Sequence, residues 1–399
     1  MRKGYVNTGL LAVLLTACSS CSMTAQIMRL DGSHLARSQA DSIVTNLMRD
    51  GKVVGLGISV LNDNEPVYIK TFGLKNSQTK EALDTATVFY GASLSKAVFA
   101  FLVMQLVQEG IIDLDKPLYK YLDKPLPDYE KYKDLAGDER WKLLTARMCL
   151  SHTTGFPNFR FFAAYSGAYD PNGKLAIYFT PGSHHAYSGE GIVLLQMVVE
   201  KIMGRDIQQL AIERIFAPAG MKRTGFTWQP SFDDNYAEGH DPDGAILTKE
   251  KKYVPNAAGS MVTTIADYTR FISYVMQGKG LSKKTRALMT SPQIRINSKY
   301  EFPTITHDTT DENNAIQLAY GLGWGVFKCK YGKVFTKGGH DDGWRHYNVN
   351  FPDRRLSIII MTNSANGEGI FKDLLEGIIG DTCTPWHWER YIPYNAATK

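Results

Sequence analysis

The sequence has few cysteines and no block of like charges. Of 399 residues, 5 are cysteine, and the formal net charge of +5 is small for this length. Cys18 and Cys21 fall near the N-terminus, while Cys149, Cys329 and Cys383 are scattered without metal-ligand spacing. We therefore expect no metal centre or other cofactor, and at most one disulfide among the last three. Without a Lys/Arg-rich segment, nucleic acid is not an expected partner.

Long apolar runs are also missing after the N-terminus, so no later segment is expected to span a membrane. The first residues combine Arg2 and Lys3 with the apolar stretch 10–15, which is typical of an export signal. The stretch ends in Leu15-Thr16-Ala17-Cys18, which resembles the bacterial lipoprotein box. We expect residues 1–17 to be a lipoprotein-type signal peptide, with a lipid on Cys18 anchoring the protein to the membrane in the bacterial cell envelope or periplasm. Cleavage near Thr24-Ala25, giving a soluble secreted protein, is the alternative.

The rest of the chain has the composition of a large globular protein, with 44% hydrophobic and 21% charged residues. Alternating apolar segments predict a hairpin over 53–72 and an antiparallel meander over 323–362, followed by a helix over 369–379. The region between them is helical with Pro- and Gly-rich loops. This order predicts an α+β fold with the site in the seam between two parts. We assign 18–32 to a tether, 33–112 and 245–385 to an antiparallel sheet domain flanked by helices, 113–244 to a mostly helical inserted domain, and 386–399 to a tail.

A hydroxyl and an amine stand one helical turn apart at the start of the most apolar stretch of the chain. Ser93 and Lys96 precede the run 97–107, which is apolar on nearly every side. Such a helix is buried inside a fold, and residues three apart share one of its faces. Burial and the positive end of the helix both disfavour the ammonium form of Lys96. The amine could therefore act as a base toward the serine.

The same spacing occurs again at Ser77 and Lys80, in a polar, turn-like segment that would not exclude water. Two further motifs distinguish Ser93 from this second match. Tyr187 lies in a loop directly before a predicted helix, and Lys337 is followed by two glycines at the predicted end of a strand, where another backbone can approach closely.

Three histidines lie near these motifs. His152, in the loop 150–157, is expected to fix that loop by hydrogen bonds. His184 and His185 would point in opposite directions on an extended segment. Because no carboxylate or cysteine partners accompany them, we predict no metal site there.

In this order and at these separations, the motifs resemble the serine β-lactamase and penicillin-binding protein superfamily. The branch of class C β-lactamases, D-aminopeptidases and related esterases is the most similar one. The resemblance extends over about 33–379 and includes the segments 110–115 and 320–324. It implies the β-lactamase/transpeptidase-like fold and a small-molecule or peptide substrate.

The resemblance also implies a role for each motif. Ser93 would be the acylated nucleophile, with Lys96 and Tyr187 transferring protons; which of these two is the base stays open. The backbone N–H groups of Ser93 and His340 would form the oxyanion hole. Substrate contacts would come from Lys337, Gly338, Gly339 and Asn366.

One position departs from the family pattern. Class C β-lactamases carry an asparagine two residues after the tyrosine, and its amide holds the acylamino group of the substrate. Here that position is Gly189, which leaves recognition of β-lactams open. The next residue, Glu190, is either a first-turn acid favoured by the helix dipole or a carboxylate that binds an amine-bearing substrate.

The sequence thus predicts an exported serine hydrolase that acts through a Ser93 acyl-enzyme on amides or esters. D-amino-acid peptides, small esters and β-lactams are the candidate substrates. The alternative is a penicillin-binding or sensor-type protein that acylates without efficient turnover. The polar stretch 291–317 has no periodicity and is expected to border the cleft.

Overall fold

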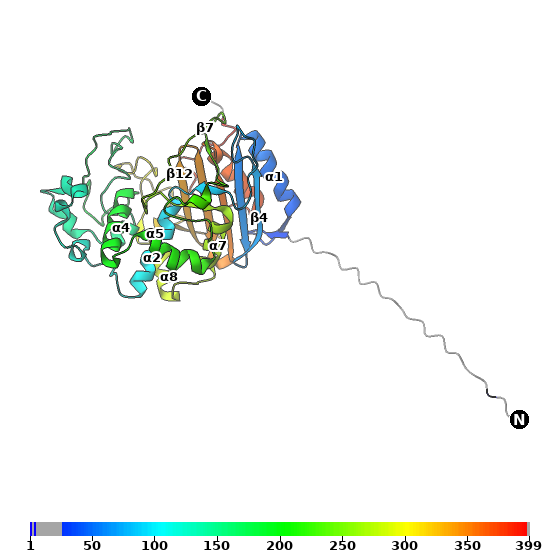
Figure 1. Cartoon of the computed structure of the whole chain (residues 1–399), viewed down its shortest axis with the longest axis horizontal. Coiled ribbons are helices and arrows are strands. Elements are labelled where there is room, and N and C mark those ends of the chain that lie inside the picture. Colours follow the sequence, from blue (N-terminus) through cyan, green and yellow to red (C-terminus); the bar gives the residue numbers. More distant parts are fainter. Residues whose placement is uncertain (2–3, 5–25, 397–399) are drawn as a thin grey trace.

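The computed structural model of the protein describes Met1, Gly4 and residues 26–396. An eight-stranded antiparallel sheet joins the two ends of this chain in the order β4-β3-β14-β13-β12-β11-β10-β9 (Figure 1). The N-terminal hairpin therefore lies beside the last strand, which confirms the predicted α+β fold. The strands are β3 (Gly55–Asn62), β4 (Glu65–Gly73), β9 (Ile294–Arg295), β10 (Ala319–Tyr320), β11 (Gly325–Cys329), β12 (Gly332–Asp341), β13 (Trp344–Phe351) and β14 (Leu356–Thr362).

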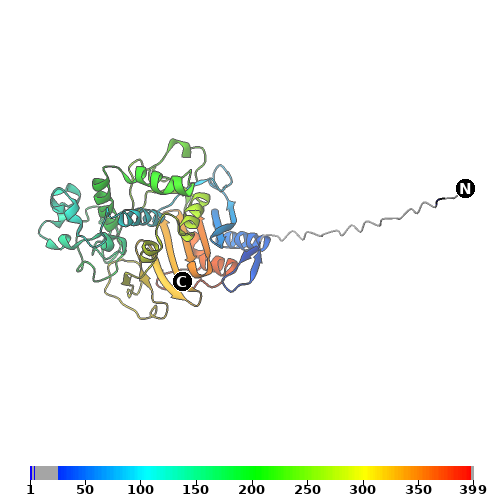
Figure 2. The same ribbon diagram turned by 90° about the horizontal axis from the view of Figure 1, so that it is seen from below.

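Helices cover both faces of the sheet, as the two views show (Figures 1 and 2). Strand β14 is buried along its whole length, and its side chains alternate between two cores. Ile358 and Ile360 join the core formed with α1 (Arg37–Asp50) and α9 (Phe371–Ile378). Ile359 and Met361 join the other core, together with α2 (Leu94–Gln108) and α7 (Ile265–Met276). The continuous apolar run of β14 follows from this double burial.

Helix α2 is the predicted buried helix, and every residue from Leu94 to Leu106 is buried. It contacts β12 on one side and α5 (Ile207–Ala211) and α8 (Lys283–Met289) on others. The chain approaches it very closely at Gly323, where a Cβ would lie 2.2 Å from the Cβ of Ala100. Only glycine leaves room for this contact, and Gly323 has a φ of +88°, a left-handed conformation that favours glycine.

The region predicted as a helical insert combines helices with irregular chain. Its longer helix is α4 (Gly189–Met203), and α3 (Ala146–Leu150) and α5 are short. Residues 151–188, between α3 and α4, form no helix or strand. Apart from short 3-10 and π-helical turns, the other short elements are α6 (Ala217–Ala219) and three strand pairs: β1 (Gln26–Met28) with β2 (His34–Ala36), β5 (Val88–Tyr90) with β8 (Val262–Thr264), and β6 (Gly239–His240) with β7 (Ile246–Leu247).

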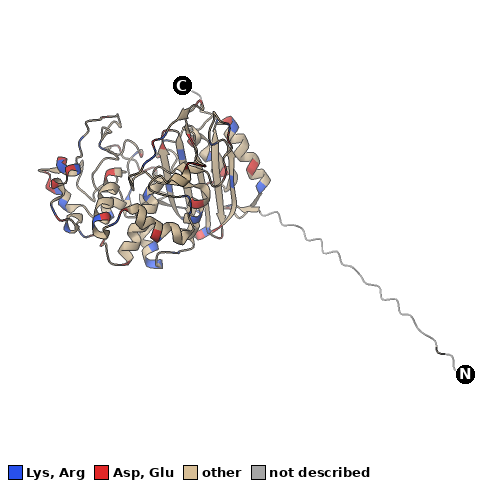
Figure 3. Cartoon of the chain, viewed as in Figure 1, with Lys and Arg blue, Asp and Glu red and all other residues tan. Residues whose placement is uncertain are grey.

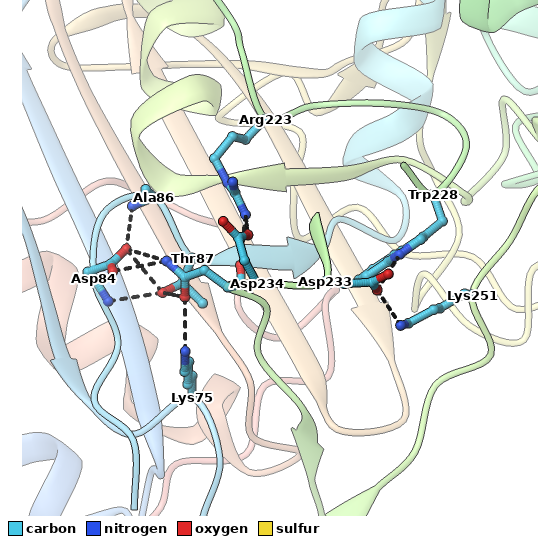
Figure 4. A network of polar contacts seen from close by, with 10 residues as sticks. Lys75, Asp84, Ala86, Thr87, Arg223, Trp228, Asp233, Asp234 and Lys251 are labelled. Atoms are coloured by element: carbon cyan, nitrogen blue, oxygen red, sulfur yellow. Dashed lines mark hydrogen bonds and ion pairs between the residues drawn. The ribbon is translucent and has the colours of Figure 1, made fainter. Parts of the chain in front are cut away.

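A polar network fastens the segment 223–251 to the turn that leads into β5 (Figure 4). Asn235 Nδ2 donates to both carboxylate oxygens of Asp84, at 3.0 and 2.9 Å, and Asn235 Oδ1 accepts from Lys75 Nζ and the Thr87 hydroxyl. The network fixes the strand that delivers Ser93. Its outer contacts are the pairs Arg223–Asp234, Lys251–Asp233 and Trp228–Asp233.

Charged residues of both signs are interspersed over the helices and loops (Figure 3). Among the described residues, no helix is long and apolar enough to cross a membrane. Cys149, Cys329 and Cys383 are free thiols. Cys18, the predicted lipidation site, and Cys21 lie outside the described residues.

Candidate active site

Ser93 lies in a tight turn between β5 and α2. It is partly exposed, whereas Gly91, Ala92 and Leu94 beside it are buried. Ala92 has a φ of 46°, a left-handed conformation that a residue with a side chain rarely adopts. The Ser95 hydroxyl holds the turn by donating to Ala92 O at 2.5 Å and accepting from the backbone N–H of Met261 at 3.0 Å. A strained, well-anchored turn thus presents the Ser93 hydroxyl at the surface of the core.

Lys96 places a buried amine against this hydroxyl. The side chain is 1% exposed, its Nζ lies 2.9 Å from Ser93 Oγ, and it donates to Ala258 O at 2.6 Å. Burial lowers the pKa of Lys96 well below its ordinary value, and the nearby cation of Lys337 lowers it further. The neutral amine has a lone pair with which to accept the Ser93 proton, as an activated serine requires.

Tyr187 lies between two lysines. The Nζ atoms of Lys96 and Lys337 are each 4.9 Å from the centre of its ring, and Lys337 Nζ donates to the phenol oxygen at 2.9 Å. Burial raises the pKa of Tyr187, and its hydrogen bond with Ser93 acts in the opposite direction. Burial also lowers the pKa of Lys337 to about 8. These directions favour Lys96 as the base and a protonated Tyr187 as the proton donor.

Lys337 lies on β12, and the strand does not end there as predicted. It continues to Asp341 and forms a hairpin with β13, whereas its pairing with β11 stops at Thr336. From Lys337 to Asp341 the strand therefore has a free edge toward α2. This edge lies so close to the turn before α2 that the second glycine is needed, because a Cβ on Gly339 would lie 2.9 Å from Gly91 O.

The free edge presents a backbone amide next to the nucleophile. In an antiparallel pair, hydrogen-bonded and non-hydrogen-bonded positions alternate. The Asp341–Trp344 pair closes a two-residue turn, so the N–H of His340 points away from β13 and toward the free edge. The N–H of Ser93, at the start of α2, has no carbonyl of an earlier helical turn to bond. These are the two amides predicted for the oxyanion hole.

The Ser93 hydroxyl opens into a cavity of about 350 Å³ in the seam between sheet and insert. The stretch 291–317 contributes Glu301 and Phe302 to its wall, so this stretch borders the cleft as predicted. Three polar wall residues, Asn158, Glu301 and Glu389, belong to no motif, and sequence reasoning missed them. The remaining lining residues are Phe159, Tyr187, Tyr320, Gly325, Thr336, Lys337, Gly338, His340, Tyr347 and Trp388.

Asn158 provides an amide close to the position where the family pattern has one. A Cβ on Gly189 would lie 2.8 Å from Asn158 O and 2.7 Å from the Phe159 ring, so the loop before it leaves no room for a side chain. Asn158 Oδ1 accepts from the N–H of Gly189 at 3.1 Å, which orients its amide. Its Nδ2 group is then available at the cavity wall. An amide from another segment thus stands near the site of the missing asparagine.

Two residues predicted to contact substrate are engaged elsewhere. The Glu190 carboxylate accepts from Arg160 Nε and Nη2 at 3.0 and 2.9 Å, and its side chain is only 7% exposed. These contacts agree with a structural first-turn acid. Asn366 Nδ2 donates to the carbonyls of Gly51 and Lys52, which fastens the end of α1, and Asn366 does not line the cavity.

The histidines have structural contacts. His152 is buried, accepts from Ser188 N–H at 3.2 Å through Nδ1 and packs against Tyr187. His185 stacks on Tyr320, while His184 bonds the Ser183 hydroxyl. Within residues 26–396, no cluster of His, Cys, Asp and Glu has the arrangement of a metal site.

Replacing Lys337 should change the pH dependence of catalysis. Since the Lys337 cation lowers the pKa of Lys96, Lys337→Met should raise it, and the acidic limb of the kcat/KM profile should move to higher pH. A p-nitrophenyl ester without charge is the suitable substrate. Lys333→Met, at an exposed position of the same strand, is the control. An unmoved limb, or one shifted to lower pH, would contradict the assignment of Lys96.

Replacing Asn158 tests the substitute amide. Asn158→Asp keeps the acceptor for Gly189 N–H but loses the donor, so kcat/KM for N-acylated amide substrates should fall by about 10- to 100-fold, the effect of one lost hydrogen bond of roughly 1–3 kcal/mol. The melting temperature should stay near that of the wild type. Asn172→Asp, exposed in the same irregular stretch, should have no effect. Full activity of Asn158→Asp would exclude a role in recognition.

The geometry agrees with comparisons to known proteins. Penicillin-binding protein 4* of Bacillus subtilis (strain 168) is 26% identical over 74% of this chain and 65% of its own length. The D-aminopeptidase of Brucella anthropi is 23% identical over 83% of this chain and 60% of its own length. The chain thus spans less than two thirds of either relative.

A solved structure has the same fold. The D-alanine carboxypeptidase AmpC from Burkholderia cenocepacia superposes with a TM-score of 0.65, at 20% identity, over 82% of this chain and 93% of its own. The model of the family described as Beta-lactamase matches residues 40–378, from within α1 to the end of α9. The chain therefore belongs to the Beta-lactamase family.

Proposed function

We propose that the protein is an exported hydrolase that forms an acyl-enzyme on Ser93 with amide or ester substrates. The observation that carries the proposal is the 2.9 Å contact between the Ser93 hydroxyl and the buried amine of Lys96. A serine beside a solvated, protonated lysine would gain no base, whereas burial lowers the pKa of this lysine and so favours its neutral form.

The proposed reaction has two halves. Ser93 Oγ attacks the substrate carbonyl while its proton passes to Lys96, and the N–H groups of Ser93 and His340 donate to the oxyanion. Tyr187 donates its proton to the leaving group as the C–N or C–O bond breaks, and is reprotonated from Lys96. Water then attacks the acyl-enzyme by the same path in reverse. This step releases the acid and restores the Ser93 hydroxyl.

The candidate substrates are D-amino-acid peptides, small esters and β-lactams. The similarity to a D-aminopeptidase supports the first class. The amide of Asn158 supports substrates with a polar group on the acyl side, because a donor at the wall would otherwise face an apolar group. A protein that acylates without turnover, as the penicillin-binding or sensor alternative requires, differs only in the second half-reaction.

A fluorophosphonate probe should label Ser93 and nothing else. Intact-mass measurement should find one adduct on the wild type, none on Ser93→Ala and one on Ser77→Ala, which removes the second Ser-x-x-Lys match. Steady turnover of p-nitrophenyl esters, D-aminoacyl anilides or nitrocefin would support a hydrolase. A burst without steady turnover would indicate the acylating, non-hydrolytic protein. A folded wild type without an adduct would refute the acyl-enzyme.

We further propose that the mature protein is anchored by a lipid on Cys18, supported by the residues Leu15-Thr16-Ala17-Cys18 after an apolar stretch. In a bacterial host fed labelled palmitate, the full chain should carry the label and sediment with membranes. Cys18→Ala should lose both properties, and Cys21→Ala should keep them. A wild type without label would contradict the anchor and leave the soluble secreted form, and label retained by Cys18→Ala would contradict Cys18 as the lipidated residue.

A further inference from the structure

The cavity wall carries two acidic side chains as well as Lys337. Glu301 and Glu389 line the same cavity as Ser93. They come from separate segments: Glu301 lies between β9 and β10, and Glu389 lies in the C-terminal segment after α9. Both segments are distant in sequence from the catalytic motifs.

These two segments are fixed to each other. The backbone N–H of Glu301 donates to Trp388 O at 2.9 Å, and Trp388 Nε1 donates to the Ser298 hydroxyl at 3.2 Å. Arg390 Nη1 donates to Phe302 O at 3.2 Å. The wall that carries both carboxylates is therefore built by main-chain and side-chain bonds, as a preorganised binding site requires.

The carboxylates retain free hydrogen-bonding capacity. Glu389 Oε1 accepts from the Tyr347 hydroxyl at 2.7 Å. Within residues 26–396, the Glu301 carboxylate makes no side-chain hydrogen bond and no ion pair within 4.0 Å. Lys337, the nearest cation of the wall, donates instead to Tyr187 OH and Gly338 O. Glu301 is half-buried at the cavity wall, so its carboxylate is accessible to a cationic ligand in the cavity.

Acidic side chains outnumber basic ones around Glu301 and Glu389. Burial raises the pKa of Glu301 to about 7, although Lys337 and Lys96 act against the rise. Burial also raises the pKa of Glu389 well above its ordinary value, and Glu301 and Glu368 raise it further. A cation placed between the two carboxylates would favour their charged forms. A substrate carboxylate there would meet two acidic side chains beside the Lys337 ammonium group.

We propose that Glu301 and Glu389 form a subsite for a cationic group of the substrate, such as the ammonium group of an amino-acid or peptide derivative. The inference rests on the proposed acyl-enzyme function, since it places this group in the cavity that Ser93 opens into. Glu301 and Glu389 would thus have the role in amine recognition that the sequence suggested for Glu190. Glu190 itself is paired with Arg160.

Three p-nitrophenyl esters of equal length test the subsite, ending in an ammonium, a methyl or a carboxylate group. The wild type should prefer the ammonium ester to the methyl ester. In Glu301→Gln and Glu389→Gln the ratio of the two kcat/KM values should fall by about tenfold or more, which corresponds to roughly 1.4 kcal/mol, mainly through KM. In the same two variants, kcat/KM for the carboxylate ester should rise relative to kcat/KM for the methyl ester. Asp308→Asn, an exposed acid of the same stretch, should keep the wild-type ratios.

A binding measurement separates this subsite from catalysis. In the Ser93→Ala background, calorimetry should give tighter binding of the ammonium ester than of the methyl ester, and Glu301→Gln should abolish the difference. Equal loss on all three esters, or unchanged ratios in both variants, would overturn the subsite. If the wild type hydrolyses no ester and takes no fluorophosphonate label, the proposed function fails, while the calorimetric comparison still decides the subsite.

Discussion

The site depends on keeping one amine away from water. Lys96 can contact Ser93 as a neutral base only because α2 is enclosed on all sides by the sheet, α5 and α8. Exposure of this helix would return the lysine to its ammonium form and remove the base. The apolar run behind Ser93 therefore has a chemical purpose as well as a packing one. The strained turn at Ala92 then places the Ser93 hydroxyl outside the core.

Much of this arrangement could be predicted from the sequence, for definable reasons. The buried helix, the N-terminal hairpin and the C-terminal meander depend on the periodicity of apolar residues, which is local. The contact of Lys96 with Ser93 follows from three-residue spacing on a helix. That Tyr187 and Lys337 lie beside Ser93 and Lys96 could be inferred only from the resemblance to a known superfamily, because no local pattern encodes contacts between distant segments.

The remaining features could not be predicted because they depend on tertiary neighbours. The very short strands β9 and β10 have no usable period. Strand β12 extends to Asp341 because a two-residue turn joins it to β13. The two glycines before this turn instead suggested that the strand ends at Lys337. From the sequence, Glu190 could bind an amine-bearing substrate. In the structure its carboxylate is paired with Arg160, thirty positions away in sequence. Asn158, Glu301 and Glu389 have unremarkable sequence surroundings and gain meaning only from the cavity they share.

Part of the cavity wall lies outside the stretch that the family model matches. The family match ends at residue 378, whereas Trp388 and Glu389 lie beyond it and still line the cavity. The reactive groups and this part of the wall thus lie in different stretches of the chain. Changes after α9 can alter which molecules are accepted while the reacting atoms stay in place. Two proteins with the same reacting residues could therefore differ in the substrates they accept.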